Sequence, residues 1–214
     1  MDLIQALAAE LGKDPRHVEN VVHLLDEGNT IPFIARYRKE LHGAMDDTSL
    51  RTLEERLQYL RGLEERREAV KKSIDEQGKL TDELTAAIDS AKTLAEVEDL
   101  YRPYKQKRRT RATMAKEKGL EPLAALLFAQ ERDCPRPEEA ARAFVDPEKG
   151  VETIEDALQG ASDIIAEQIS DDAAIRKSLR ALISRQGQLV SRAATEDDSV
   201  YRLYYDFTQS VARL

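Results

Sequence analysis

The longest helix-compatible stretch, residues 48–77, constrains the fold more than any other feature of this chain. Its apolar side chains recur at the three- and four-residue spacing of one helix face, and Gly78 follows as a terminator. The apolar positions on or near this face are Leu50, Leu53, Leu57, Leu60, Leu63, Val70 and Ile74. Continuing the heptad register puts Glu64 and Arg67 at the next seam positions, so we expect a bundle helix instead of a coiled coil. Gly62 within the stretch predicts a kink or a close packing contact.

Three short helical patterns precede this stretch. Asp14 followed by Pro15 is typical of a helix start, and Gly12 and Gly28 mark helix ends on either side. Thr30 is placed to begin a third short helix that reaches Tyr37. Short helices joined by tight glycine-bearing corners predict a helix-turn-helix-like unit over residues 1–45.

Helical patterns also dominate the remainder, and we expect a helical bundle over residues 46–198. The predicted helices cover approximately residues 81–88, 93–100, 111–118, 122–127, 138–145, 151–169 and 171–186, the last capped by Ser170. Only 5% of the residues are aromatic and tryptophan is absent, whereas Leu, Ala, Glu, Arg and Lys are common. The fold class is therefore predicted to be all-α, an irregular helical bundle with one long central helix. Residues 199–214 form an apolar and aromatic tail, which predicts a surface that needs a partner.

The charge distribution singles out residues 101–118 as a basic loop. This segment carries a net charge of +7, while the whole chain carries -8. Pro103 and the shortage of aliphatic residues predict extended backbone over residues 101–110. Such a segment is suited to contact nucleic-acid phosphates, and an unpaired base could stack on its tyrosines. The candidate nucleic-acid-binding residues are Tyr101, Arg102, Tyr104, Lys105, Lys107, Arg108, Arg109, Arg111 and Lys116.

A structural role for the same loop is equally open. The rest of the chain is acidic, so the loop could lie in an internal acidic groove with both tyrosines as core anchors. A secondary basic cluster, Arg36, Arg38 and Lys39, ends the helix-turn-helix-like unit. Helix dipoles favour cations at that position, so capping explains this cluster better than binding does.

No pattern points to catalysis. His17 and His23 would face different sides of one helix, no HExxH or glycine-rich phosphate loop occurs, and the carboxylates alternate with Arg and Lys as on a solvated face. Cys134 has no plausible base and no disulfide partner. We expect no enzyme activity, metal site, cofactor or small-molecule substrate. The N-terminus lacks a signal-peptide pattern and no long apolar run occurs, so a cytoplasmic location without a membrane span is expected.

Five motifs, taken together, resemble the N-terminal region of the Tex family of bacterial transcription accessory proteins. They occur in family order at residues 30–40 (TIPFIARYRKE), 53–61 (LEERLQYLR), 76–80 (EQGKL), 99–111 (DLYRPYKQKRRTR) and 119–123 (GLEPL). The resemblance implies a non-enzymatic factor that binds RNA, DNA or both without sequence preference, with RNA polymerase as a further possible partner. A protein-interaction or architectural module is the alternative that it leaves open.

The resemblance also implies that this region is part of a longer protein. In the family, an RNase H-like domain, helix-hairpin-helix elements and an OB-fold module follow, and Tyr204 to Phe207 resemble the segment just before the RNase H-like domain. Nucleic-acid binding in the family is attributed mainly to the OB-fold module. The basic loop is therefore expected to add an auxiliary contact or an internal brace.

Overall fold

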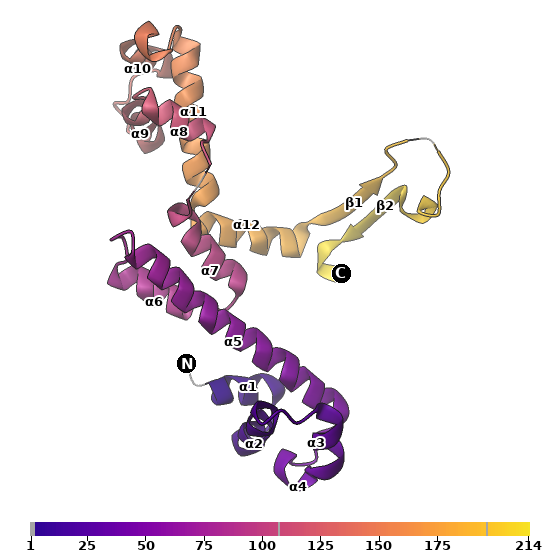
Figure 1. The fold of residues 1–214 in the computed structure, drawn as a ribbon. Coiled ribbons are helices and arrows are strands. Elements are labelled where there is room, and N and C mark those ends of the chain that lie inside the picture. The colour runs from indigo at the N-terminus through magenta and orange to yellow at the C-terminus, as the bar shows by residue number, and fades with distance from the viewer. Residues whose placement is uncertain (1–2, 107, 196) are drawn as a thin grey trace. The chain divides into compact units, whose positions relative to one another are not determined.

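The computed structural model describes residues 3–106, 108–195 and 197–214, and the chain divides into two compact units, residues 1–97 and 98–214. Helices dominate both units, and the described residues include one two-stranded sheet (Figure 1). The all-α prediction is thus confirmed. The two compact units divide between Val97 and Glu98. The domain boundaries that the sequence predicts after residues 45 and 198 stay predictions.

The first unit consists of helices with short connections. They are α1 (Leu3–Leu11), α2 (Pro15–Asp26), α3 (Ile31–Tyr37), α4 (Lys39–His42), α5 (Asp47–Asp75), α6 (Asp82–Ser90) and the start of α7 (Leu94–Tyr101). Side-chain caps define three of the starts: Asp14 accepts from the Arg16 amide at 2.8 Å, Asp46 from Ser49 at 2.7 Å and Thr81 from Leu84 at 3.2 Å. These caps satisfy amides that the first helical turn leaves without partners.

The core of the first unit lies where α1, α2 and α3 pack against the N-terminal half of α5. Its fully buried side chains include Leu7, Val18, Ile34 and Leu53. The predicted long helix therefore exists and anchors the short ones. Farther along α5, Arg67 is buried and donates from Nη2 to the carbonyl oxygen of Ala91 at 2.6 Å, next to α6.

The second unit contains helices, short 3₁₀ turns and the sheet. Its elements after α7 are η1 (Arg102–Tyr104), α8 (Arg111–Glu117), α9 (Glu121–Ala129), α10 (Pro137–Ala141), η2 (Arg142–Phe144), η3 (Pro147–Lys149), α11 (Ile154–Asp171), α12 (Ala173–Gln186), β1 (Gln188–Arg192), η4 (Arg202–Tyr204), β2 (Asp206–Ser210) and η5 (Val211–Arg213). A capping box of Thr153 and Asp156 starts α11.

Helix α11 is the centre of the second core, and α8, α9 and α10 pack on it. Small residues permit this close approach: Ala157 and Ala161 are fully buried, and a Cβ atom at Gly160 would lie 2.3 Å from Cδ1 of Leu120. By contrast, α12 contributes no buried residue. It extends from the core and leads directly into the hairpin (Figure 1).

Two predicted helix starts in the second unit need correction, and one element was not predicted. Residues 188–192, for which no helix or strand was predicted, pair with residues 206–210 as antiparallel strands of a hairpin. Val190 lies opposite Thr208 in this pairing, and the β-branched side chains of both residues favour a strand. Asp172, not Ser170, caps α12 by accepting from the amide of Ile175 at 2.8 Å. Val151 lies outside α11 because it forms a bridge with Asp146.

Candidate nucleic-acid interface

The basic segment is not one extended loop. Tyr101 is the last residue of α7 and residues 102–104 form a 3₁₀ turn, so the prediction of extended backbone is wrong for residues 101–104. Proline is tolerated in a first helical turn, which explains why Pro103 does not break this turn. Residues 105, 106 and 108–110 have no regular structure, and α8 begins at Arg111 with its N-terminus capped by Thr110.

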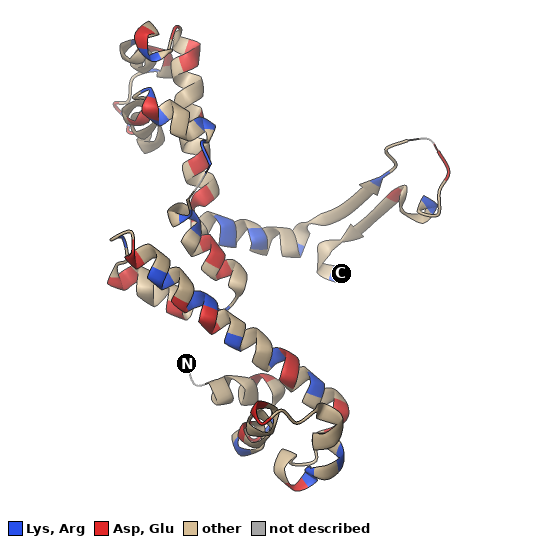
Figure 2. Cartoon of the chain, in the orientation of Figure 1, with Lys and Arg blue, Asp and Glu red and all other residues tan. Residues whose placement is uncertain are grey.

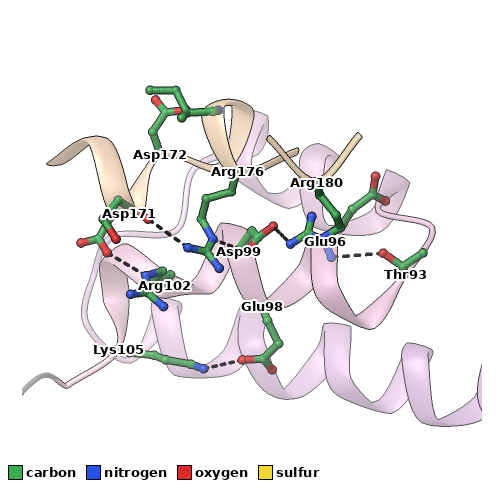
Figure 3. A network of polar contacts seen from close by, with 12 residues as sticks. Thr93, Glu96, Glu98, Asp99, Arg102, Lys105, Asp171, Asp172, Arg176 and Arg180 are labelled. Atoms are coloured by element: carbon green, nitrogen blue, oxygen red, sulfur yellow. Dashed lines mark hydrogen bonds and ion pairs between the residues drawn. The ribbon is translucent and has the colours of Figure 1, made fainter. Parts of the chain in front are cut away.

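The first half of the segment is held by carboxylates of its own unit. Nε of Arg102 lies 2.9 Å from Oδ1 of Asp171, at the end of α11, and Lys105 forms an ion pair with Glu98. Figure 3 shows both contacts. Nζ of Lys105 also lies 5.4 Å from the centre of the Tyr101 ring, and both Tyr101 and Tyr104 are half-buried. These contacts fix the position of the backbone over residues 101–105.

A buried carboxylate next to this turn joins α7 to α12. Asp99 is only 5% exposed, and its two oxygens accept from Nε of Arg176 and from Nη2 of Arg180, each at 2.6 Å (Figure 3). Burial acts to raise the pKa of Asp99, but the hydrogen bonds from the two guanidinium groups outweigh it and hold the pKa below its ordinary value. We call Asp99, Arg102, Asp171, Arg176 and Arg180 the Asp99 clasp.

The second half of the segment faces solvent. Arg108, Arg109, Arg111 and Lys116 are all exposed. Arg109 pairs with Glu117 at 2.6 Å and Lys116 with Glu121 at 3.5 Å, whereas no carboxylate of the described residues forms an ion pair with Arg108 or Arg111. We call these four residues the outer basic face. Lys107, the remaining candidate, lies outside the described residues.

The secondary basic cluster lies where α3 passes into α4, in the first unit. The guanidinium group of Arg38 lies 5.1 Å from the Phe33 ring centre and donates to the carbonyl oxygen of Tyr37 at 3.1 Å. Arg36 and Lys39 are exposed, and Arg36 lies 6.0 Å from the ring centre of Tyr37. Arg38 therefore bonds a carbonyl oxygen at the C-terminal end of α3, where cations are favoured, and the capping role of the cluster stays a prediction.

Sequence reasoning missed the role of α12. Arg176 and Arg180 are separated from Asp99 by 77 and 81 positions, so no local spacing reveals their contact. One signal was present in the sequence: from Ala173 to Thr195 the chain has five basic residues and no acid. A helix of one charge sign in an acidic chain indicates an interaction surface.

Two further properties concern chemistry and membranes. No group of three or more His, Cys, Asp or Glu side chains suited to a metal ion occurs among the residues that the structure describes. Within the same residues, no helix combines the length and the apolar character needed to cross a bilayer. Cys134 is half-buried, with Sγ 3.8 Å from the carbonyl oxygen of Leu126.

Comparison with known proteins decides the family. Residues 1–75 match the family described as Tex-like protein N-terminal domain, and residues 133–214 match the Tex central region-like family. The chain belongs to the Tex-like proteins. This assignment confirms the resemblance that the five sequence motifs indicated.

Individual relatives agree with the assignment. The Tex-like chain is 46% identical over 216 residues to the protein YdcI of Bacillus subtilis, which covers 99% of the chain and 30% of YdcI. It is 42% identical over 208 residues to the transcriptional accessory protein Tex of Neisseria gonorrhoeae, covering 97% of the chain and 27% of that protein. It is 32% identical over 173 residues to S1 RNA-binding domain-containing protein 1 of Homo sapiens, covering 80% of the chain and 17% of that protein. The chain thus spans less than a third of the length of these relatives.

Proposed function

We propose that this Tex-like chain is a non-enzymatic scaffold segment of a transcription accessory factor, and that its outer basic face adds phosphate contacts to bound nucleic acid. The observation that carries the proposal is the exposure of Arg108 and Arg111 without an ion pair to any described carboxylate. Guanidinium groups with open donor sites bind phosphate oxygens bidentately. Because such contacts read no bases, the expected binding is independent of sequence.

The two halves of the basic segment have different roles in this proposal. Arg102 and Lys105 already bond Asp171 and Glu98, so a phosphate would have to displace these carboxylates. The half-buried Tyr101 has a cation over its ring, which disfavours base stacking there. We infer that the first half positions the second, and that phosphate contacts come mainly from Arg108 and Arg111, because Arg109 and Lys116 also pair with carboxylates.

The names of two relatives support a role with nucleic acid. One is called a transcriptional accessory protein and another an RNA-binding domain-containing protein. Since this chain spans only part of each, the outer basic face is proposed as an auxiliary site beside a principal one elsewhere in a longer protein. Neither name indicates enzymatic activity.

Fluorescence anisotropy tests this function with single-stranded RNA and duplex DNA at two salt concentrations. The double variant Arg108→Ala/Arg111→Ala should lose affinity for both, and the slope of log K against log salt should fall by about one for each phosphate contact removed. Arg51→Ala is the matched control, since it removes an exposed arginine of α5 that pairs with Asp47 at 2.8 Å. Equal loss in the control, or no loss in the double variant, would contradict the proposal.

An architectural function is the second candidate. The Asp99 clasp favours it, because Asp99 already pairs with Arg176 and Arg180, and Asp171 with Arg102, beside the basic turn. In that case the segment would brace the domain or dock on a protein such as RNA polymerase. The anisotropy series separates the two functions, since a pure brace predicts the same nucleic-acid affinity for all three proteins.

A further inference from the structure

Helix α12 carries an apolar stripe that its neighbours in the described chain, α11 and η5 among them, cover only in part. Ile175, Leu179, Leu182 and Ile183 are 36%, 51%, 42% and 55% exposed. Their spacing of i, i+4, i+7 and i+8 places them within one face of about 100° on an α-helix. Anchors at this spacing are how a helix packs against another helix. The stripe therefore has the geometry of a helix-packing face that remains about half exposed.

The stripe continues into a groove at the base of α12. Ile175 lines a groove of about 360 Å³ together with Phe128 of α9 and Ile169 of α11. These two side chains are 52% and 41% exposed. Large apolar side chains that remain half-exposed around one groove mark an interaction site, because burying them would release ordered water. Groove and stripe together form one apolar track along the second unit.

The charge beside the stripe bears on the partner: the groove at the base of α12 is lined by one acid, Asp172, whereas the stripe itself is flanked by basic residues. At 100° per residue, Arg176 borders the stripe on one side of the helix and Arg185 on the other. Helix α12 contains four basic residues and no acid, and Figure 2 shows its ribbon with basic but no acidic positions. Arg176 bonds Asp99, whereas Arg185 is exposed and donates to the carbonyl oxygen of Ala181 in its own helix, at 3.3 Å. Charges beside an apolar stripe favour a partner helix with charges of the opposite sign.

We infer that this track docks an acidic amphipathic helix of a partner protein. The partner's apolar side chains would lie on Leu179, Leu182 and Ile183, and its flanking carboxylates would face Arg185. The inference is independent of the proposed nucleic-acid contacts, which involve the outer basic face. Failure of one experiment therefore leaves the other unaffected.

Two other occupants fit less well. A second copy of the chain that paired α12 with α12 would bring like charges together along the whole contact, which is unfavourable. An anionic membrane would suit a broad apolar face, whereas this stripe covers only about 100° of the helix and has no aromatic residue to lie at an interface. Each alternative is an outcome of the experiment below.

The experiment uses the 214-residue chain and a fluorescein-labelled helical peptide with leucine at i, i+4, i+7 and i+8 and glutamate at the flanking positions. A peptide with lysine in place of glutamate is the matched probe. The glutamate peptide should bind saturably and the lysine peptide should bind at least tenfold more weakly. Leu179→Ser/Ile183→Ser should weaken binding by at least tenfold, and Leu203→Ser, at an 87% exposed position of the hairpin, should not.

Charge reversal completes the experiment. Arg185→Glu should weaken binding of the glutamate peptide by roughly fivefold and strengthen binding of the lysine peptide. The inference is overturned if no saturable binding occurs, if both peptides bind equally, or if Leu179→Ser/Ile183→Ser binds like the unchanged chain. The inference is likewise overturned if the chain binds phosphatidylglycerol vesicles and not the peptide. It is also overturned if light scattering shows a dimer that Leu179→Ser/Ile183→Ser abolishes.

Discussion

At the scale of single residues, Asp99 is the most consequential side chain of the second unit. It is a buried carboxylate bonded by two arginines, and these arginines belong to a helix with no buried residue of its own. A buried charge without partners costs several kcal/mol, so the three side chains depend on one another. The ion pair between Arg102 and Asp171, which holds the start of the basic segment, belongs to the same clasp.

Asp99→Asn should therefore destabilise the second unit by roughly 2 kcal/mol at pH 7, since two partly exposed guanidinium groups lose their shared anion. The pKa of Asp99 is lowered in the folded state, so its contribution is fully present above the ordinary aspartate pKa of about 3.9 and is lost as pH falls through the lower, folded-state value. Urea unfolding monitored at several pH values measures both effects.

A matched control comes from the same unit. Asp198 pairs with Arg202 at 3.3 Å and is largely exposed, so Asp198→Asn should change the unfolding free energy by less than about 1 kcal/mol. If Asp99→Asn were as mild as this control, the clasp would not be a stabilising feature of the unit.

At the scale of elements, sequence patterns predicted the helices well and the tertiary contacts poorly. The span of α5 followed from its leucine spacing, and α2 followed from Asp14 and Pro15, because caps and periodicity are local signals. The exposure of the outer basic face did not follow, since it depends on which carboxylates the fold brings near each arginine. The hairpin was missed because β1 pairs with residues that lie 14 to 22 positions away.

Helix α5 offers a test of local propensity. Gly62 lies inside the helix, and a Cβ atom built there meets no heavy atom within 4 Å, so the expected close packing contact is wrong. Gly62→Ala should stabilise the first unit by about 1 kcal/mol in chemical denaturation, because alanine loses less backbone entropy in a helix. Destabilisation would show that the glycine has a role in packing after all.

Gly43 supplies the opposite case in the same unit. Its φ of 61° lies in the left-handed region, and an added Cβ would lie 2.1 Å from Nδ1 of His17. Gly43→Ala should therefore destabilise the unit by more than about 1 kcal/mol in the same assay. Two glycine-to-alanine changes with opposite signs separate helix propensity from steric fit.

At the scale of the whole molecule, the chain is an acidic helical scaffold on which basic residues are concentrated at a few places. Its net charge of -8 would repel a polyanion in general, so contact with nucleic acid depends on local exposure of positive side chains. In the second unit Arg108 and Arg111 provide such exposure without an ion pair to a described carboxylate, whereas Arg102 and Lys105 are paired with Asp171 and Glu98. This division between a bracing half and a contacting half is the central claim.

Side-chain NMR of the arginine Nε–Hε groups tests this claim most directly, with single lysine substitutions to assign the signals. On titration with single-stranded RNA, the signals of Arg108 and Arg111 should shift, because these side chains have open donor sites. The signals of Arg102 and Arg176, whose Nε atoms already bond carboxylates at 2.9 and 2.6 Å, should stay in place. Shifts at Arg102 and Arg176 with none at Arg108 and Arg111, or no shift at any of the four, would contradict the account.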